Sequence, residues 1–280
     1  MPDTVVITRP AAQAAPLAAK VAALGLPVQL LPLLEIHALA GEEECAQLQA
    51  VLRRLADYDL VAFVSPNAID CVFAHLAAWP AGVPLAVVGE GSRLALGAHG
   101  VTDANASITS PRDAARSDSE HLLLALDLPA LRGKRVLIVR GDGGRDYLAD
   151  GLRGAGATVE FVTAYRRKVP ALTPALRATL EQLLQHNNHW IITSSEALRG
   201  LQALLAALDA AGDEKTAVAK MQQQHLIVPH ARIAQTATAL GFARVTLTGS
   251  GDAGVLAALQ SRPGTNCLHA PNRMHRLAAP

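Results

Sequence analysis

Two hydrophobic patterns alternate along this chain. Short runs of β-branched and aliphatic residues, which are typical of buried strands, are followed by stretches in which apolar residues recur at helical spacing, as at Leu17, Val21 and Leu24. The predicted strands are Val5–Thr8, Leu60–Val64, Leu85–Val88, Val136–Val139, Val159–Thr163, Trp190–Thr193, Leu226–Val228 and Val245–Leu247. Because strands that alternate with helices are joined by right-handed crossovers, the pattern predicts an α/β protein with parallel sheets flanked by helices.

Glycine follows several of the predicted helices at the point where each should end. A glycine just past a helix can adopt the left-handed conformation that stops it. We therefore expect helix ends at Gly25, Gly100, Gly156 and Gly241.

Three kinds of strand-to-helix unit occur twice, in the same order. One strand ends in Arg, the next ends in a hydroxyl residue at a helix start, and the third leads through a short turn into a helix. The units begin at Val5, Leu60 and Leu85, and again at Arg135, His189 and Leu226. The repeat predicts two similar domains with a cleft between them, because parallel strands aim backbone N–H groups at one edge of each sheet.

Two extended segments interrupt this alternation. Residues 31–39 (LPLLEIHAL) and 162–170 (VTAYRRKVP) each continue a strand as extended chain with a proline at one end, and we interpret them as connectors between the domains. Residues 110–119 are expected to form a polar surface loop with a helix cap within Ser117–Ser119. From residue 263 the chain lacks periodicity, and this tail is expected to be frayed.

The length and composition fit two globular domains of ordinary size. The chain has 280 residues, of which 50% are hydrophobic and 18% are charged, so each domain can bury its own core. A formal net charge of +1 argues against a broad nucleic-acid or membrane-surface role. An anionic ligand must therefore be held by a local cluster of donors.

The cysteines and the start of the chain point to a reducing compartment. Cys45, Cys71 and Cys267 are widely spaced and odd in number, which supports neither a disulfide framework nor a zinc site. The chain enters a predicted strand without a basic and apolar leader, and no apolar run approaches the length of a membrane span. We therefore expect a cytoplasmic protein.

Two glycine-rich turns follow predicted strands. Gly89 and Gly91 resemble the start of a dinucleotide fingerprint, but Leu94 stands where the third glycine belongs. The segment RGDGGR, from Arg140 to Arg145, lacks the Lys-Ser/Thr of a phosphate-binding loop. Its two arginines favour carboxylate binding, although a glycine-rich turn can also be purely structural.

Hydroxyl residues, histidines and a tyrosine are the remaining candidates. Ser65 and Ser194 stand at helix starts after strands, so both are expected as N-caps and as ligand contacts. The absence of a G-x-S-x-G elbow argues against a serine nucleophile. Tyr165 lies in a predicted connector, either as an interface residue or as a proton donor at the cleft. His186 and His189 are interpreted as part of a solvated loop and not as metal ligands.

Taken together, these segments resemble the uroporphyrinogen-III synthase family. The matching pieces run in the family's order from Val5 to about Leu259 and include VVITRP, LVAFVSPNAID, VVGEGSRLAL and IITSSEAL. The most specific pair is RGDGGR followed about twenty residues later by AYRR. The chain departs from the family at His230, where a small hydroxyl residue is usual, and the tail after Pro263 lies outside the resemblance.

The resemblance implies a lyase that needs no metal and no cofactor. Such an enzyme removes the terminal hydroxyl of linear hydroxymethylbilane as water and closes the tetrapyrrole with its last ring inverted, through azafulvene and spiro intermediates. Closure without inversion happens readily in solution, so the enzyme must above all fix the geometry of its substrate. Backbone N–H groups at helix starts supply donors for the eight substrate carboxylates. The expected partner is this small molecule alone, with no nucleic acid or membrane, and the expected state is a monomer.

The resemblance also implies site residues. Tyr165 is the candidate proton donor to the departing hydroxyl. The candidate substrate contacts lie in loops that follow predicted strands: Arg9, Ser65, Asn67, Ala68, Gly89, Gly91, Ser92, Arg140, Gly141, Gly143, Gly144, Arg145, Ser194, Ser195 and His230.

A further implication is that the two domains exchange their first units. Residues 1–36 together with 167–262 would form one discontinuous domain, residues 37–166 an inserted domain, and residues 263–280 a disordered tail. The two connectors would then pair as an antiparallel two-stranded linker, which satisfies their backbone groups. Strand Val5–Thr8 would pair with strands after residue 185 and not with Leu60–Val64.

Two other functions stay open on the sequence alone. A non-catalytic two-domain receptor for a small anion has the same kind of fold, although no output surface or DNA-binding segment is recognisable. A nucleotide-sugar glycosyltransferase also uses paired α/β domains, and the incomplete dinucleotide fingerprint argues against it only weakly.

Overall fold

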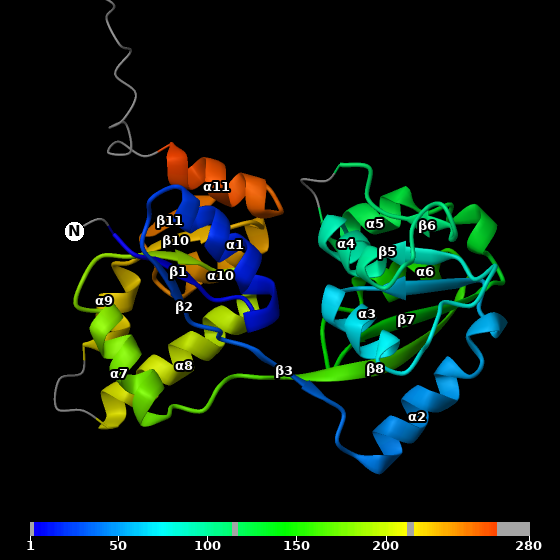
Figure 1. The fold of residues 1–280 in the computed structure, drawn as a ribbon, viewed down its shortest axis with the longest axis horizontal. Coiled ribbons are helices and arrows are strands. Elements are labelled where there is room, and N and C mark those ends of the chain that lie inside the picture. The colour runs from blue at the N-terminus through cyan, green and yellow to red at the C-terminus, as the bar shows by residue number, and fades with distance from the viewer. Residues whose placement is uncertain (1–2, 114–116, 212–215, 262–280) are drawn as a thin grey trace, which may run out of the picture.

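The computed structural model describes residues 3–113, 117–211 and 216–261, so the predicted tail from residue 263 lies outside the described residues. Two lobes, each built around one sheet, are joined by a narrow waist of two strands (Figure 1). The fold is therefore α/β with two similar domains, as the repeated units predict.

The first domain contains the beginning and the end of the described chain. Its sheet has the order β11-β10-β9-β1-β2, and every pairing in it is parallel. The strands are β1 (Val5–Ile7), β2 (Val28–Leu30), β9 (His189–Ile191), β10 (His225–Val228) and β11 (Arg244–Leu247). The helices are α1 (Ala11–Ala23), α7 (Pro174–Leu183), α8 (Ser195–Ala211), α9 (Ala217–Gln222), α10 (Ala231–Ala239) and α11 (Asp252–Gln260).

Alternate residues of these strands face two different helical layers. Val6 and Trp190 belong to the buried cluster formed with α7, α8, α9 and α10. Val5, Ile7 and Ile191 belong to the cluster formed with α1 and α11. Successive side chains of a strand point to opposite faces of a sheet, so continuous apolar runs are required where both faces are covered.

The second domain is built on a sheet with the order β3-β8-β7-β4-β5-β6. The strands are β3 (Glu35–Ala38), β4 (Leu60–Phe63), β5 (Leu85–Val87), β6 (Ile108–Thr109), β7 (Arg135–Gly141) and β8 (Thr158–Lys168). The helices are α2 (Glu42–Leu52), α3 (Pro66–Phe73), α4 (Glu90–Ala98), α5 (Ser119–Ala125) and α6 (Tyr147–Gly154), with 3-10 turns at Leu55–Asp57 and Pro129–Leu131. Helices α2, α3 and α4 cover one face, and α5 and α6 cover the other.

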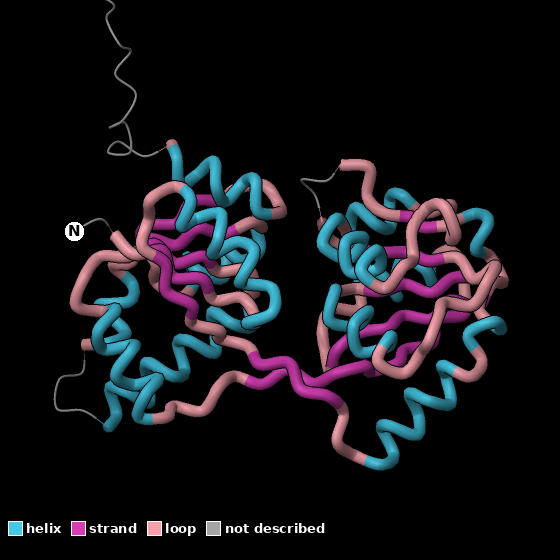
Figure 2. Tube along the Cα trace, in the orientation of Figure 1, coloured by secondary structure: helices cyan, strands magenta, loops and turns pink. Residues whose placement is uncertain are grey.

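The waist consists of β3 and the end of β8. The two strands pair antiparallel, with Glu35 opposite Lys168 and Ala38 opposite Tyr165. Strand β8 is 11 residues long and passes without interruption from parallel pairing with β7 into the waist, which Figure 2 shows as two strands passing from one lobe to the other. The predicted antiparallel linker is confirmed.

Strand pairing also decides how the chain is routed between the lobes. Strand β1 pairs with β9, with Val5 opposite His189, whereas β4 pairs with β5 and β7. The expectation that Val5–Thr8 pairs with strands after residue 185 is confirmed. The residue limits given above for the two domains stay a prediction.

The sequence signals predicted helix ends better than they predicted edge strands. Gly25, Gly100, Gly156 and Gly241 all have left-handed φ values, between 75° and 92°. Asp118 supplies the cap expected within Ser117–Ser119, since its side chain accepts the backbone N–H of His121. The edge strands β2 and β6 were not predicted. Both are short, with three and two residues, and neither has a fully buried residue.

Candidate functional site

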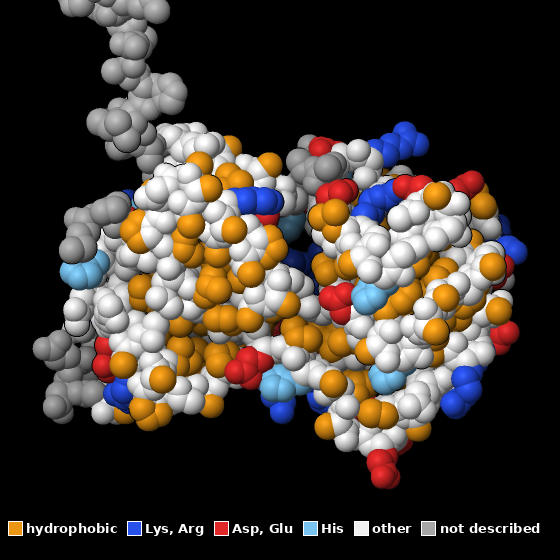
Figure 3. Space-filling model, viewed as in Figure 1, with side chains coloured by type: hydrophobic (Ala, Val, Ile, Leu, Met, Phe, Trp, Pro, Cys, Tyr) orange, Lys and Arg blue, Asp and Glu red, His pale blue; other side chains and the backbone are white. Residues whose placement is uncertain are grey.

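A cavity of about 520 Å³ lies in the cleft between the two domains. The space-filling view is hollowed between the lobes, and basic side chains lie at this hollow (Figure 3). The second domain contributes the ends of β4 and β7, the loop before α6, and β8. The first domain contributes the starts of α8 and α10. These are the carboxyl ends of parallel strands and the helix starts that follow them, where ligands bind in open α/β sheets.

Tyr165 and Ser65 meet on the second-domain wall. The side chain of Tyr165 is 4% exposed, and its phenol oxygen lies 3.0 Å from Ser65 Oγ. Ser65 is the N-cap of α3, and its Oγ accepts the backbone N–H of Ala68 at 3.1 Å. The Ser65 proton is therefore available to be donated to the phenol oxygen, while the cap fixes the position of the hydroxyl.

A glycine makes room for this tyrosine. A Cβ added at Gly141 would lie 2.8 Å from two atoms of the Tyr165 ring, which is closer than carbon atoms approach. The register of β7 and β8 shifts between Arg140 and Gly141, so that Gly141 comes to lie opposite Tyr165. A glycine within a strand commonly marks such a close approach. The RGDGGR motif thus has a packing role at its first glycine.

Two arginines of the same motif are held by nearby acids. Arg140 lies over the Phe161 ring at 3.9 Å and donates to Asp146 at 2.7 Å. Arg145 donates hydrogen bonds from both of its terminal nitrogens to the carboxylate of Glu120 in α5, one of them at 2.9 Å. This bidentate pairing lowers the pKa of Glu120 and raises the pKa of Arg145. Both guanidinium groups line the cleft but are already neutralised.

The remaining glycines of the motif allow the loop to turn. Gly143 and Gly144 have φ values of 140° and 132°, a conformation that L side chains rarely adopt. Both line the cavity. Their backbone can therefore approach a ligand without side-chain atoms in between.

Arg167, near the end of β8 in the waist, contacts the start of helix α8. Its Nη1 lies 2.9 Å from Glu196 of α8, and its backbone N–H donates to Asp142 at 2.9 Å. Its Nε is buried and makes no hydrogen bond with the described residues, although Asp142 Oδ1 lies 4.0 Å away. The sequence placed Arg167 beside Tyr165 but did not mark it as a site residue.

Two serines build the first-domain wall. Ser194 Oγ accepts the backbone N–H groups of Glu196 and Ala197, so it caps α8 as expected. Ser195 is buried, and its Oγ accepts the Thr236 hydroxyl of α10 at 3.1 Å. Ser195 therefore holds α8 and α10 together, and both serines line the cavity.

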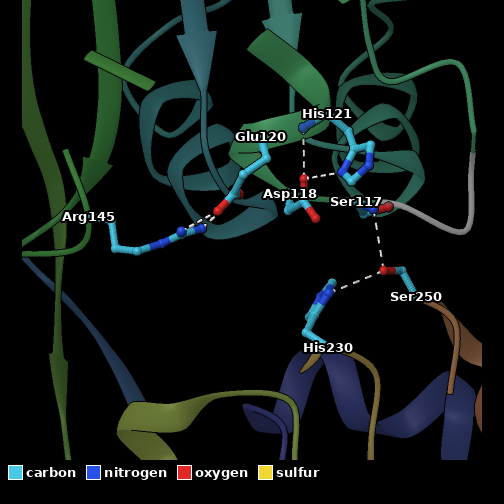
Figure 4. A network of polar contacts seen from close by, with 7 residues as sticks. All are labelled: Ser117, Asp118, Glu120, His121, Arg145, His230 and Ser250. Carbon is cyan, nitrogen blue, oxygen red and sulfur yellow. Dashed lines mark hydrogen bonds and ion pairs between the residues drawn. The ribbon is translucent and has the colours of Figure 1, made fainter. Parts of the chain in front are cut away.

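A polar network joins the domains away from the waist (Figure 4). The backbone N–H of Ser117 donates to Ser250 Oγ at 3.3 Å, and the same oxygen lies 3.4 Å from His230 Nδ1. Asp118 accepts both the backbone N–H and the ring of His121. The network therefore links the segment before α5 to the loops that precede α10 and α11. It is a contact between the two lobes away from the waist, in addition to the Gln13–Asn67 hydrogen bond.

The ionisation of His230 depends on its burial and on the charged groups near it. Burial lowers the pKa of the imidazole below its ordinary value, and the nearby charges of Arg232 and Arg145 lower it further. The carboxylates of Asp118 and Glu120 act in the opposite direction but do not outweigh these effects. His230 is therefore neutral at neutral pH.

Several predicted contacts lie outside the cavity. Arg9 donates to Asp252 at 2.6 Å within the first domain. Asn67 accepts from Gln13 of α1 at 2.8 Å and lines a separate cavity next to Pro10, Pro32 and Cys71. Ala68 is fully buried, and its N–H is used by the Ser65 cap. His230 does not line the cavity either.

The start of α4 is also separated from the cavity. A Cβ added at Gly89 would lie 2.1 Å from Ser117 Oγ, so the segment before α5 covers this helix start. Gly91 lies close to the Pro66 ring, since a Cβ there would be 3.7 Å from it. Ser92 is 2% exposed, and its Oγ has no hydrogen-bond partner among the described residues. Substrate contacts at these positions stay predictions.

Besides Arg167, three charged residues of the cleft were not among the predicted site residues. Arg199 in α8, Arg232 in α10 and Glu196 line the cavity from the first domain. All three lie in the first or second helical turn after a predicted ligand-binding strand end. Charged residues at such positions were the signal that could have identified them.

Two kinds of feature are not found among the described residues: a cluster of metal ligands and a membrane-spanning helix. Within residues 3–113, 117–211 and 216–261 no group of three His, Cys, Asp or Glu side chains is placed to hold a metal ion. None of the helices in these ranges has the length and apolar character needed to cross a membrane.

A family model and several curated relatives match most of this chain. Residues 15–248 match the family model described as uroporphyrinogen-III synthase HemD. Curated relatives with the name uroporphyrinogen-III synthase include that of Synechococcus elongatus, 32% identical over 73% of this chain and 75% of its own length, and that of Escherichia coli, 30% identical over 72% and 80%. The relative from Salmonella typhimurium is 35% identical over 59% of this chain, and the match spans 65% of its length.

Solved structures agree on the architecture. The uroporphyrinogen-III synthetase of Helicobacter pylori aligns over 94% of this chain and all of its own, with a TM-score of 0.58 and 16% identity. A mutant uroporphyrinogen III synthase of Thermus thermophilus aligns over 92% and 97%, with a TM-score of 0.53 and 14% identity. At such identities the likeness concerns the fold alone.

Proposed function

Because the chain belongs to the uroporphyrinogen-III synthase family, we propose that it converts hydroxymethylbilane to uroporphyrinogen III in the cleft between its two domains. The chain is a cyclising lyase of tetrapyrrole biosynthesis. Neither the anion receptor nor the nucleotide-sugar glycosyltransferase is favoured by the family match. The proposed substrate is a linear tetrapyrrole with eight carboxylates.

The observation that supports this most is the hydroxyl pair of Tyr165 and Ser65 at a cavity with a basic lining. As the terminal carbon–oxygen bond breaks, the phenol proton of Tyr165 passes to the departing hydroxyl, which leaves as water. The electron pair of the pyrrole nitrogen forms the azafulvene. Ser65, whose Oγ is held by the Ala68 N–H, donates its proton in a hydrogen bond to the phenolate left behind.

The later steps require geometry more than acid–base chemistry. A substituted ring carbon attacks the azafulvene to give the spiro intermediate, which fragments and recloses with the last ring inverted. The uninverted closure competes in solution, so the cleft must hold both ends of the chain in one arrangement. Gly144 offers a backbone N–H at the cavity for this purpose, whereas the N–H of Gly143 already donates to the Gly141 carbonyl at 2.8 Å. The hydroxyls of Ser65 and Ser194 line the same cavity at two helix starts.

The waist gives the two domains a way to close on the substrate. Strands β3 and β8 satisfy each other's backbone groups over a few residues, so they can bend without losing their hydrogen bonds. We propose residues 1–36 with 167–262 as one domain and 37–166 as the other. Closure would exclude water from the azafulvene. We also propose that the protein is a monomer in the cytoplasm.

A product analysis tests this function. Purified protein is supplied with hydroxymethylbilane, the products are oxidised, and the isomers are separated by chromatography. The proposal expects the type III isomer with the protein and the uninverted type I isomer without it. Type I alone at every protein concentration would overturn the proposed function.

A further inference from the structure

Five arginines line the cavity, and three of them already have acidic partners within the chain. Arg140 pairs with Asp146 at 2.7 Å, and Arg145 pairs with Glu120. Arg167 pairs with Glu196 at 2.9 Å. Any of these three must give up an ion pair before it can bind a substrate carboxylate with its full hydrogen-bonding capacity.

The other two arginines differ in this respect. Arg199 and Arg232 line the same cavity, yet neither side chain makes a hydrogen bond or an ion pair with the residues that the structure describes. Arg199 lies in the second turn of α8, and Arg232 is the second residue of α10. The hydroxyls of Ser195 and Thr236 join these two helices at 3.1 Å, so both guanidinium groups come from one rigid wall.

The surroundings of Arg232 favour an anion. Burial lowers the pKa of its guanidinium, and the charges of Arg145 and Arg199 lower it further, whereas the carboxylates of Glu120 and Asp118 act in the opposite direction without outweighing these effects. The group stays charged. Because Glu120 pairs with Arg145, the repulsion that a ligand can relieve is the one between Arg199 and Arg232. A carboxylate placed between them removes this repulsion and adds bidentate hydrogen bonds, for which guanidinium geometry is suited.

We propose that Arg199 and Arg232 form a carboxylate-binding site on the first domain, which holds peripheral carboxylates of the tetrapyrrole. This inference rests on the proposed function for the identity of the ligand. The site lies across the cleft from Tyr165 and Ser65. One domain thus binds side chains of the substrate, while the other supplies the proton donor. The pair also helps a chain with a formal net charge of +1 to attract a polyanion, since it places two positive charges without acidic partners among the described residues at the cleft.

The variants Arg199→Gln and Arg232→Gln test the site. Each removes the charge and keeps an unbranched polar side chain, although a shorter one. We expect KM for hydroxymethylbilane to rise about tenfold in each, since a hydrogen-bonded charge is typically worth that much, with kcat within about threefold. Calorimetric titration with uroporphyrinogen III, kept reduced under anaerobic conditions, should show a matching loss of affinity. The loss should shrink at high salt, where the wild type is also weakened.

The matched control is Arg177→Gln. Arg177 lies on α7 of the same domain, pairs with Glu181 at 3.6 Å and does not line the cavity. Its KM and product affinity should equal those of the wild type. Arg232→Lys is the conservative variant, and it should recover part of the affinity because it keeps the charge but not the planar fork.

A stability measurement separates binding from a structural role. Without ligand, Arg232→Gln should unfold at the same temperature as the wild type or higher, because it removes a repelled charge. A lower unfolding temperature together with unchanged KM would mean that Arg232 supports the fold, and it would overturn the proposal.

The remaining outcomes separate the site from the reaction. If the wild type forms the type III isomer while both Gln variants keep its KM and its product affinity, the carboxylate site is wrong and the function stands. If the wild type binds the tetrapyrrole through Arg199 and Arg232 but does not cyclise hydroxymethylbilane, the site stands and the function is wrong.

Discussion

The phenol oxygen of Tyr165 lies 3.0 Å from the hydroxyl oxygen of Ser65 on one wall of the cleft. The two residues are 100 positions apart in the chain: Tyr165 lies in β8, and Ser65 lies at the start of α3. Ser65 owes its position to its role as a helix cap, and Tyr165 owes its position to the start of the waist. The local structure of the helix start and of the waist thus places two hydroxyl groups next to each other at the cavity.

Loss of the Ser65 hydroxyl should weaken turnover only in part. Ser65→Ala removes the cap of α3, which should lower the free energy of unfolding by about 0.5–2 kcal/mol. The backbone donors around the cavity remain, so we expect kcat to fall by about tenfold or less, the worth of one neutral hydrogen bond. Steady-state kinetics and urea unfolding measure the two effects. Complete inactivation of a folded Ser65→Ala protein contradicts a supporting role for this side chain.

Gly141→Ala should displace the tyrosine. The added methyl group would approach the Tyr165 ring to 2.8 Å, so the ring or strand β7 must shift. We expect a loss of about 1–3 kcal/mol in the free energy of unfolding, typical of overpacking, together with a large fall in kcat. Gly154→Ala is the matched control, because no atom lies within 4 Å of its added Cβ. Equal activity in the two variants would contradict the requirement for a close approach.

His230 should make stability depend on pH. Its pKa is lowered in the folded protein, chiefly by burial, so the unfolded chain binds its proton more readily. Its contribution is fully present above the unfolded pKa of about 6.5 and is lost as pH falls below that value toward the folded pKa. His230→Asn places a residue that is favoured at helix N-caps and cannot titrate. The difference in free energy of unfolding between wild type and variant, measured from pH 8 to pH 5, should therefore change in this window. A difference that is constant over the range would argue against the assignment.

Activity should not require a metal ion or a nucleotide. The described residues offer no group of three ligands for a metal, and the glycine-rich turn at Gly89 lacks the third glycine of a dinucleotide site. Exhaustive dialysis against a chelator should leave the rate of hydroxymethylbilane consumption unchanged. A loss that only an added metal restores would contradict this expectation.

The strands and the linker could be predicted because their signals are local. Buried parallel strands such as Leu60–Phe63 need continuous apolar runs, and the extended segments around Glu35 and Lys168 have no helical spacing. The loops at Ser65 and Arg140 could be predicted as neighbours because the carboxyl ends of parallel strands share one edge. The edge strand Val28–Leu30 has no fully buried residue and leaves a weaker pattern.

The charge pattern of the cleft could not be predicted in the same way. Arg145 is neutralised by Glu120, 25 positions earlier, and Arg167 in the waist by Glu196 of α8. Whether an arginine keeps its charge free for a ligand depends on such pairings, which arise only when distant segments pack. The place of Arg199 soon after a strand end marks it as a candidate in the sequence, but only the packing of the described residues leaves its charge without an acidic partner.

The most direct test of the account compares two buried tyrosines of the second domain. Tyr165→Phe removes the phenol in the cleft, whereas Tyr58→Phe removes one that donates to Glu160 at 2.7 Å and does not line the cavity. Both rings stay packed, so both variants should fold. The rate of hydroxymethylbilane consumption, corrected for spontaneous closure, should fall about a hundredfold or more in Tyr165→Phe, as expected for loss of a general acid. KM should stay within a few-fold, and Tyr58→Phe should react as the wild type does. An unchanged rate in Tyr165→Phe would contradict the account and leave water as the proton donor.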